Sequence, residues 1–136
     1  MSIFDHLLQQ VRPVASIRLI YTTKVEGGPV DSSRILFLER VMRLIGQAKG
    51  CHVQLDLFLT GTSSDQLDNA RGLPANVKAG RVTHADLEAA LGTDIRGRES
   101  TVCYICGPPR MTDEFVDFIA GRKGMSEERV LCEKWW

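Results

Sequence analysis

The chain has 136 residues, a length typical of a single domain that buries its own hydrophobic core. Its 17 basic residues balance its 17 acidic ones and are scattered, so the charge does not favour nucleic acid or an anionic membrane as a partner. No apolar run approaches the roughly 20 residues that span a bilayer. The start of the chain also lacks the pattern of a secretory signal peptide.

The first half of the chain predicts a helix, a strand, a second helix and a second strand. Apolar residues at helical spacing mark the first helix, and they are Ile3, Phe4, Leu7, Leu8 and Val11. Residues 17–21 predict a strand that ends in residues 22–24, and Asp31 or Ser32 is expected to cap the next helix. The apolar side of that helix comprises Ile35, Leu38, Val41, Met42 and Ile45. Residues 53–60 predict a strand that is apolar on both faces.

The second half continues the alternation of helices and strands. Residues 61–80 predict a polar loop, and Thr83 to Asp86 resembles a capping box that opens a helix through Leu91. Residues 92–100 predict another loop before a strand over 101–105. Thr112 is expected to cap a helix that bears Phe115, Phe118 and Ile119, and residues 129–132 predict a last strand. The expected fold is therefore α/β, with a parallel, Rossmann-like sheet that has helices on both faces.

Four cysteines without a secretory signal indicate a reducing compartment, either mitochondrial or cytoplasmic. Cys103 and Cys106 form a C-x-x-C pair, but residues three apart in a strand point to opposite faces, which disfavours a shared metal ion or a disulfide. A thiol-redox protein is therefore the weaker alternative. The three histidines lack metal-ligand spacing, and no metal site is predicted.

The junction at Cys106 is the most informative stretch of the chain. A β-branched, apolar run stops at Cys106-Gly107-Pro108-Pro109, and a helical pattern follows. This pattern predicts a buried parallel strand that feeds a rigid loop at its carboxyl end, where open α/β sheets bind their ligands. Gly107 allows close approach of the backbone to a ligand, and the two prolines fix φ.

Four short motifs resemble the nicotinamide-nucleotide half of the ferredoxin–NADP reductase superfamily. Cys106-Gly107-Pro108-Pro109-x-Met111 is similar to its C-G-P-P-x-M loop, and Tyr21-Thr22-Thr23-Lys24 resembles a strand end near the adenosine and pyrophosphate. Gly80-Arg81-Val82-Thr83 resembles its G-R-[VI]-T motif. The end of the chain, Glu133-Lys134-Trp135-Trp136, is similar to the E-K-W-W end of oxidoreductase NAD-binding domain-containing proteins.

This resemblance covers essentially the whole chain and implies a role in hydride transfer between a pyridine nucleotide and a flavin. It implies that Cys106 lies beside the nicotinamide and that Glu133 forms a hydrogen bond near the reacting ring, which makes these two the candidate catalytic residues. The implied nucleotide-binding residues are Tyr21, Thr22, Thr23, Lys24, Thr60, Cys106, Gly107, Pro108, Pro109, Met111, Trp135 and Trp136.

The choice between NAD(H) and NADP(H) depends on cations, because a 2′-phosphate requires Arg or Lys. Family members that prefer NADP(H) often carry Ser-Arg where this chain has Thr60-Gly61-Thr62. The absence of a cation at that point favours NAD(H), although Lys24 keeps NADP(H) open.

The chain departs from the resemblance in two places. It contains neither the flavin-binding β-barrel nor the first strand of the sheet with its Gly-rich turn, a strand that in this superfamily lies between those predicted at residues 17–21 and 101–105. We therefore expect residues 1–136 to be an N-terminally incomplete NAD-binding domain, which binds nucleotide weakly, does not bind FAD and is inactive alone. The alternative is a non-catalytic module that senses nucleotide or binds a partner.

Overall fold

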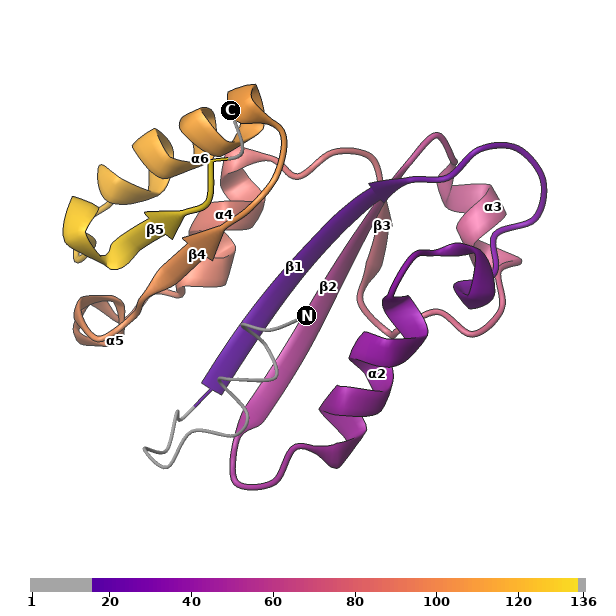
Figure 1. Ribbon diagram of the computed structural model, residues 1–136, viewed down its shortest axis with the longest axis horizontal. Helices are drawn as coiled ribbons and strands as arrows, with labels where there is room; N and C mark the ends of the chain where they lie inside the picture. Colours follow the sequence, from indigo (N-terminus) through magenta and orange to yellow (C-terminus); the bar gives the residue numbers. More distant parts are fainter. Residues whose placement is uncertain (1–15, 135–136) are drawn as a thin grey trace. The chain divides into compact units, whose positions relative to one another are not determined.

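The computed structural model describes residues 16–134 (Figure 1). The chain divides into two compact units, of which the first ends at Arg81 and the second begins at Val82. The predicted first helix, Trp135 and Trp136 lie outside the described residues. No helix of residues 16–134 is long and apolar enough to cross a membrane.

The first unit is built on a three-stranded parallel sheet. Its strands are β1 (Ser16–Lys24), β2 (His52–Thr60) and β3 (Val77–Ala79), in the order β1-β2-β3. β1 extends the predicted strand through residues 22–24, and its register pairs Lys24 with Thr60. The polar ends of β1 and β2 therefore lie side by side at the carboxyl edge of the sheet.

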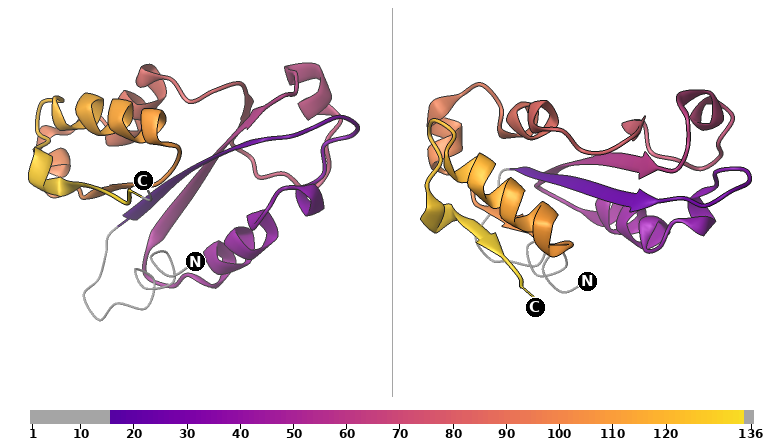
Figure 2. Two further views of the ribbon diagram at one scale, coloured as in Figure 1. Left: turned by 45° about the horizontal axis from the view of Figure 1, so that its top comes forward. Right: turned by 90° about the horizontal axis from the view of Figure 1, so that it is seen from above.

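Helix α2 (Leu38–Gln47) lies along one face of β1 and β2 (Figure 2). Its buried Leu38 and Val41 form the core of this unit together with Leu55, Leu57 and Leu59 of β2. The alternation predicted for β2 is confirmed, and the buried Phe58 makes its second face apolar.

The start predicted for this helix is wrong. Asp31 does cap a helix, but that helix is the short 3-10 turn η1 (Ser32–Arg34), and α2 begins only at Leu38. Ile35 is extended and Phe37 adopts a left-handed conformation, so these two residues interrupt the helical path.

The prediction of a loop over residues 61–80 is also wrong in part. Helix α3 (Ser64–Asp68) begins at a capping box of Ser63 and Gln66, and β3 follows it. A five-residue helix and a three-residue strand are too short to produce a recognisable hydrophobic period, which is why both were missed.

The second unit combines a two-stranded parallel sheet with three α-helices. Its elements are α4 (His84–Leu91), α5 (Ile95–Glu99), β4 (Cys103–Ile105), α6 (Pro109–Ala120), η2 (Glu127–Arg129) and β5 (Val130–Cys132). Helix α6 packs on both strands and α4 packs against α6 (Figure 1). The predicted capping box of α4 is confirmed, with Thr83 and Asp86 bonded to each other's backbone N–H.

Three predictions for this unit need correction. Residues 92–100 contain α5 instead of a continuous loop. The strand near Cys106 is short and only partly buried, because Val102 and Tyr104 are exposed. Pro108, not Thr112, precedes the first residue of α6. Pro109 fits that first position because the N–H it lacks has no partner within a helix. The parallel α/β class is confirmed, although the described strands form two sheets.

Candidate functional site

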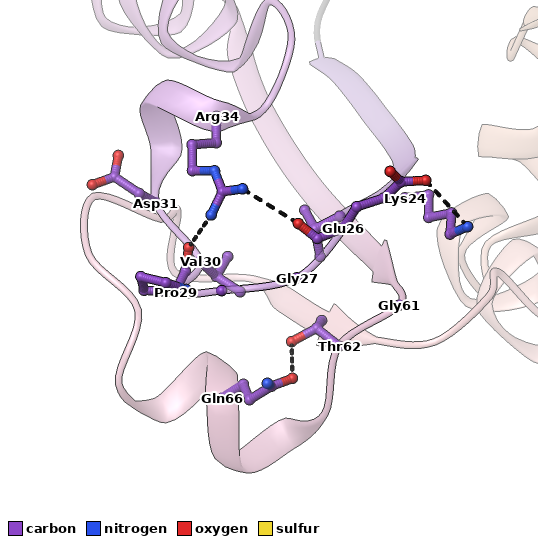
Figure 3. Close-up of a pocket in the computed structure, with 12 residues that line it drawn as sticks. Lys24, Glu26, Gly27, Pro29, Val30, Asp31, Arg34, Gly61, Thr62 and Gln66 are labelled. Atoms are coloured by element: carbon purple, nitrogen blue, oxygen red, sulfur yellow. Dashed lines mark hydrogen bonds and ion pairs between the residues drawn. The ribbon is translucent and has the colours of Figure 1, made fainter.

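A pocket of about 270 Å³ lies where β1 and β2 end (Figure 3). We call it the strand-end pocket. Its walls come from the loop after β1, from η1 and from the segment that leads into α3. The lining residues are Lys24, Val25, Glu26, Gly27, Gly28, Pro29, Val30, Asp31, Arg34, Gly61, Thr62 and Gln66.

The loop after β1 folds around the side chain of Arg34. Its guanidinium donates one hydrogen bond to the carbonyl of Pro29, at 3.0 Å, and a longer one to that of Glu26, at 3.3 Å. Gly28, at φ +81°, allows this arrangement, since a Cβ there would lie 3.1 Å from Nη1 of Arg34. Arg34 therefore fixes the shape of the loop.

Gly61 allows the segment after β2 to lie close against the loop after β1. The N–H of Val25 donates to the carbonyl of Thr60 at 2.9 Å, so pairing continues past the end of β1. A Cβ on Gly61 would lie 2.4 Å from the carbonyl oxygen of Val25, a distance that no side chain permits. Thr62 then donates to Oε1 of Gln66 at 2.9 Å, which fixes the start of α3.

The charged side chains of the strand-end pocket differ in the partners that they contact. Nζ of Lys24 lies 3.4 Å from Oε1 of Glu26, and both side chains are largely exposed, at 68% and 81%. Hydrogen bonds from the backbone and hydroxyl of Ser33 hold the pKa of Asp31 below its usual range, with a smaller contribution from the charge of Arg34. The guanidinium of Arg34 has no carboxylate within ion-pair distance among residues 16–134.

Of the binding residues expected in this unit, only Lys24 lines the strand-end pocket. The hydroxyl of Tyr21 donates to the carbonyl of Leu36 at 2.7 Å, and partial burial raises the pKa of Tyr21. Thr22, Thr23 and Thr60 lie in β1 and β2 without contributing to the lining, and their roles stay predictions. Sequence reasoning missed Arg34, because it follows a loop and belongs to no recognisable motif.

The Cys106–Pro109 loop joins β4 to α6 in the second unit. Thr112, fully buried, donates its hydroxyl to the carbonyl of Gly107 at 3.1 Å and its N–H to the carbonyl of Pro108 at 3.0 Å. These two bonds tie the loop to the first turn of α6. Met111 folds back, and its Cε would lie 2.1 Å from a Cβ on Gly107. The space over Gly107 is thus filled by a flexible thioether that a ligand can displace.

The sheet brings Cys106 and Glu133 to the same edge. The N–H of Glu133 donates to the carbonyl of Ile105 at 3.3 Å, so the two candidate catalytic residues follow neighbouring parallel strands. Tyr104 ends on the same side, and its pKa is raised first by desolvation and then by its interaction with Glu133. Strand alternation, which places residues 104 and 106 on one side, was the signal that could have identified Tyr104.

The four cysteines differ in exposure. Cys106 is exposed, whereas Cys51, Cys103 and Cys132 are half-buried. Burial raises the pKa of the Cys103 thiol, against a smaller opposing effect from Arg129. A raised pKa leaves less thiolate at neutral pH, so Cys103 is a poor nucleophile.

The size and donors of the strand-end pocket suit part of a nucleotide. Its volume lies just below the range of about 300 to 1,000 Å³ that is typical of sites for drug-sized ligands. The pocket therefore accommodates a ribose with a phosphate but not a whole dinucleotide. Two cations, Lys24 and Arg34, line it together with two carboxylates, and cationic side chains are the donors that phosphate oxygens require.

Comparisons with known proteins found relatives of one name. The chain is 29% identical over 123 residues to oxidoreductase NAD-binding domain-containing protein 1 of Xenopus laevis, a match that covers 90% of the chain and 34% of the relative. The proteins of that name from Bos taurus and Homo sapiens are each 26% identical, with the same coverage. No family model and no solved structure matches the chain.

The chain spans about a third of the length of these curated relatives. Most of each relative therefore has no counterpart here. Across the matched third, the resemblance to oxidoreductase NAD-binding domain-containing proteins indicated by the sequence motifs is confirmed.

Proposed function

We propose that this chain is the pyridine-nucleotide-binding part of an oxidoreductase that transfers a hydride between NAD(P)H and a flavin, with NAD(H) as the preferred nucleotide. The observation that carries the proposal is the match over 90% of the chain to relatives whose name contains "NAD-binding domain". The position of both candidate regions at the carboxyl ends of parallel strands supports it, because α/β sheets bind nucleotides there.

The two candidate regions have different roles in this proposal. In the first unit, the strand-end pocket is the candidate for contacts to sugar and phosphate groups. In the second unit, the Cys106–Pro109 loop is the candidate for contacts to the nicotinamide. The ties between Thr112 and the loop carbonyls keep the loop next to Cys106 in place. When bound, the nicotinamide and the flavin supply the hydride chemistry, while the protein supplies position and excludes water.

The flavin comes from outside the described residues in this proposal. Within residues 16–134, β1 pairs only with β2, and β4 pairs only with β5. The superfamily resemblance assigns one further strand to the open sides of β1 and β4. We propose that this strand and a flavin-binding domain are supplied by another part of the complete protein or by a partner, and that the chain alone does not reduce flavin.

Alkylation of cysteines in the full 136-residue chain tests nucleotide binding at the loop. Iodoacetamide should modify the exposed Cys106 first, and NADH at about ten times its Kd should slow that reaction about ten-fold, because only the unbound fraction reacts. Peptide mass spectrometry gives the rate at each cysteine, and the half-buried Cys51 of the first unit is the internal control.

AMP is the matched ligand control, because it has the adenosine part and lacks nicotinamide. AMP should leave the alkylation of Cys106 unchanged while it competes with NADH. Failure of NADH to bind, or equal protection of Cys51 and Cys106, contradicts the proposed function.

A further inference from the structure

Arg34 is a fixed cation in the strand-end pocket. Its side chain is exposed at the pocket wall, yet hydrogen bonds to the carbonyls of Pro29 and Glu26 hold the guanidinium in one place (Figure 3). These bonds use two of the five N–H donors of the guanidinium and leave three for a ligand. A long side chain that is already ordered loses little further freedom when it binds.

The carboxylates that share the pocket are engaged elsewhere. Glu26 faces Lys24, and Asp31 accepts the two hydrogen bonds of Ser33, pointing away from the guanidinium in Figure 3. The charge of Asp31 still acts on Arg34 at longer range. Among residues 16–134, Arg34 nevertheless has carbonyl partners only, and carbonyls orient a guanidinium without neutralising its charge. A pocket with an ordered, un-neutralised guanidinium favours an anionic ligand.

We propose that Arg34 binds a phosphate group of the nucleotide that occupies the strand-end pocket. This inference rests on the proposed function and assigns a specificity-determining role to a residue that no motif indicates. Arg fits a phosphate with two parallel hydrogen bonds, whereas the exposed, paired Lys24 offers a weaker point charge. Two phosphates of a pyridine nucleotide have this chemistry: the 2′-phosphate of NADP(H), and the diphosphate common to NAD(H) and NADP(H).

Binding of four ligands to the wild-type chain and to Arg34→Gln tests the proposal. Calorimetric titration with NADH, NADPH, 2′-AMP and adenosine gives each Kd. Loss of the charged contact should weaken the binding of a phosphate-bearing ligand about ten-fold or more. Adenosine, which has no phosphate, should bind both proteins equally. An equal loss for adenosine means that Arg34 only shapes the loop and overturns the proposal, as does unchanged binding of all four ligands.

The pattern of losses identifies the phosphate. Loss confined to NADPH and 2′-AMP assigns Arg34 to the 2′-phosphate. Equal loss for NADH and NADPH, with 2′-AMP unaffected, assigns it to the diphosphate. Arg34→Lys, which keeps the charge without the planar fork, should restore part of the affinity. Lys24→Gln removes the neighbouring, paired cation and should cost less than about five-fold.

Failure of the proposed function is distinguishable from failure of this inference. If the wild-type chain binds no nucleotide, the proposed function fails, and inorganic pyrophosphate then tests Arg34 alone. NMR shifts of residues 26–34 should respond to pyrophosphate in the wild type and not in Arg34→Gln. No response in the wild type overturns the anion site.

Discussion

At the scale of single residues, Phe37 adopts a backbone conformation that aromatic residues rarely take. It has φ 64° and ψ −3°, and it is the one non-glycine residue with positive φ between residues 16 and 134. It sits at the N-cap of α2, where its side chain makes no cap hydrogen bond and is 55% exposed. The left-handed conformation costs an L-residue about 1–2 kcal/mol. Because the Phe37 ring is mostly exposed, its burial offsets little of this cost.

Phe37→Asn should stabilise the first unit by about 0.5–1 kcal/mol. Asparagine tolerates the left-handed region and caps helices, so it removes strain and offers an acceptor to the N–H groups of α2. The free energy of unfolding from urea titration measures the effect. Leu36→Asn is the matched control, because Leu36 is 67% exposed and has no positive φ. Equal changes in the two variants would show that surface apolarity, not backbone strain, sets the stability here.

At the scale of elements, the length of a segment decided what the sequence could predict. The nine residues of β2 display a full alternation, and the capping box of α4 is a local signal, so both were predicted correctly. Helices α3 and α5 have five residues each, about one and a half turns, and a hydrophobic period cannot be recognised over so short a span.

The position of α5 depends on two arginines, the buried Arg98 and the half-buried Arg129. Arg98, with a side chain 7% exposed, donates to the carbonyls of Gly92 and Lys123 and pairs with Glu88 at 2.7 Å. Arg129 donates in turn to the carbonyls of Arg98, Thr101 and Gly124. The bonds of Arg98 with Lys123 and of Arg129 with Arg98 and Thr101 span more than 20 residues and leave no local pattern, so the order of residues 92–100 could not be predicted.

Arg98→Ala should destabilise the second unit by about 2–4 kcal/mol. The change leaves the carbonyls of Gly92 and Lys123 without their partner and removes the charge that faces Glu88. Thermal unfolding followed by circular dichroism measures the loss. Arg96→Ala is the control, because Arg96 lies in the same helix and is exposed, and it should change stability by less than about 0.5 kcal/mol. Similar losses in both variants would contradict the role of Arg98.

At the scale of the whole molecule, the candidate site was predicted where it depends on strand ends and missed where it depends on loops. The sequence indicated Lys24 and Cys106 as candidates because each stands at the carboxyl end of a strand, Lys24 in β1 of the first unit and Cys106 after β4 of the second. Arg34 reaches the strand-end pocket through the path of the loop at Gly27 and Gly28, both of which have positive φ, and such a loop path is not encoded in a periodic pattern.

The open side of β1 gives a prediction about how this chain fits into a larger assembly. The N–H of Val25 donates to β2, so alternation directs the N–H groups of Tyr21 and Thr23 to β2 as well. Those of Ile20 and Thr22 point to the other side, where β1 has no partner strand among the described residues. A bare strand edge is a ready site for another strand.

Hydrogen exchange of the 136-residue chain, measured by NMR, should therefore divide β1 into two sets. The amides of Ile20 and Thr22 should exchange at least ten-fold faster than those of Tyr21 and Thr23. Each amide of the second set donates a hydrogen bond to β2, and within residues 16–134 each amide of the first set lacks one. Addition of the polypeptide proposed to supply a further strand should slow exchange at Ile20 and Thr22 and leave Tyr21 and Thr23 little changed. Equal protection of both sets in the chain alone would mean that β1 already has a second neighbour, and the need for an outside strand would disappear.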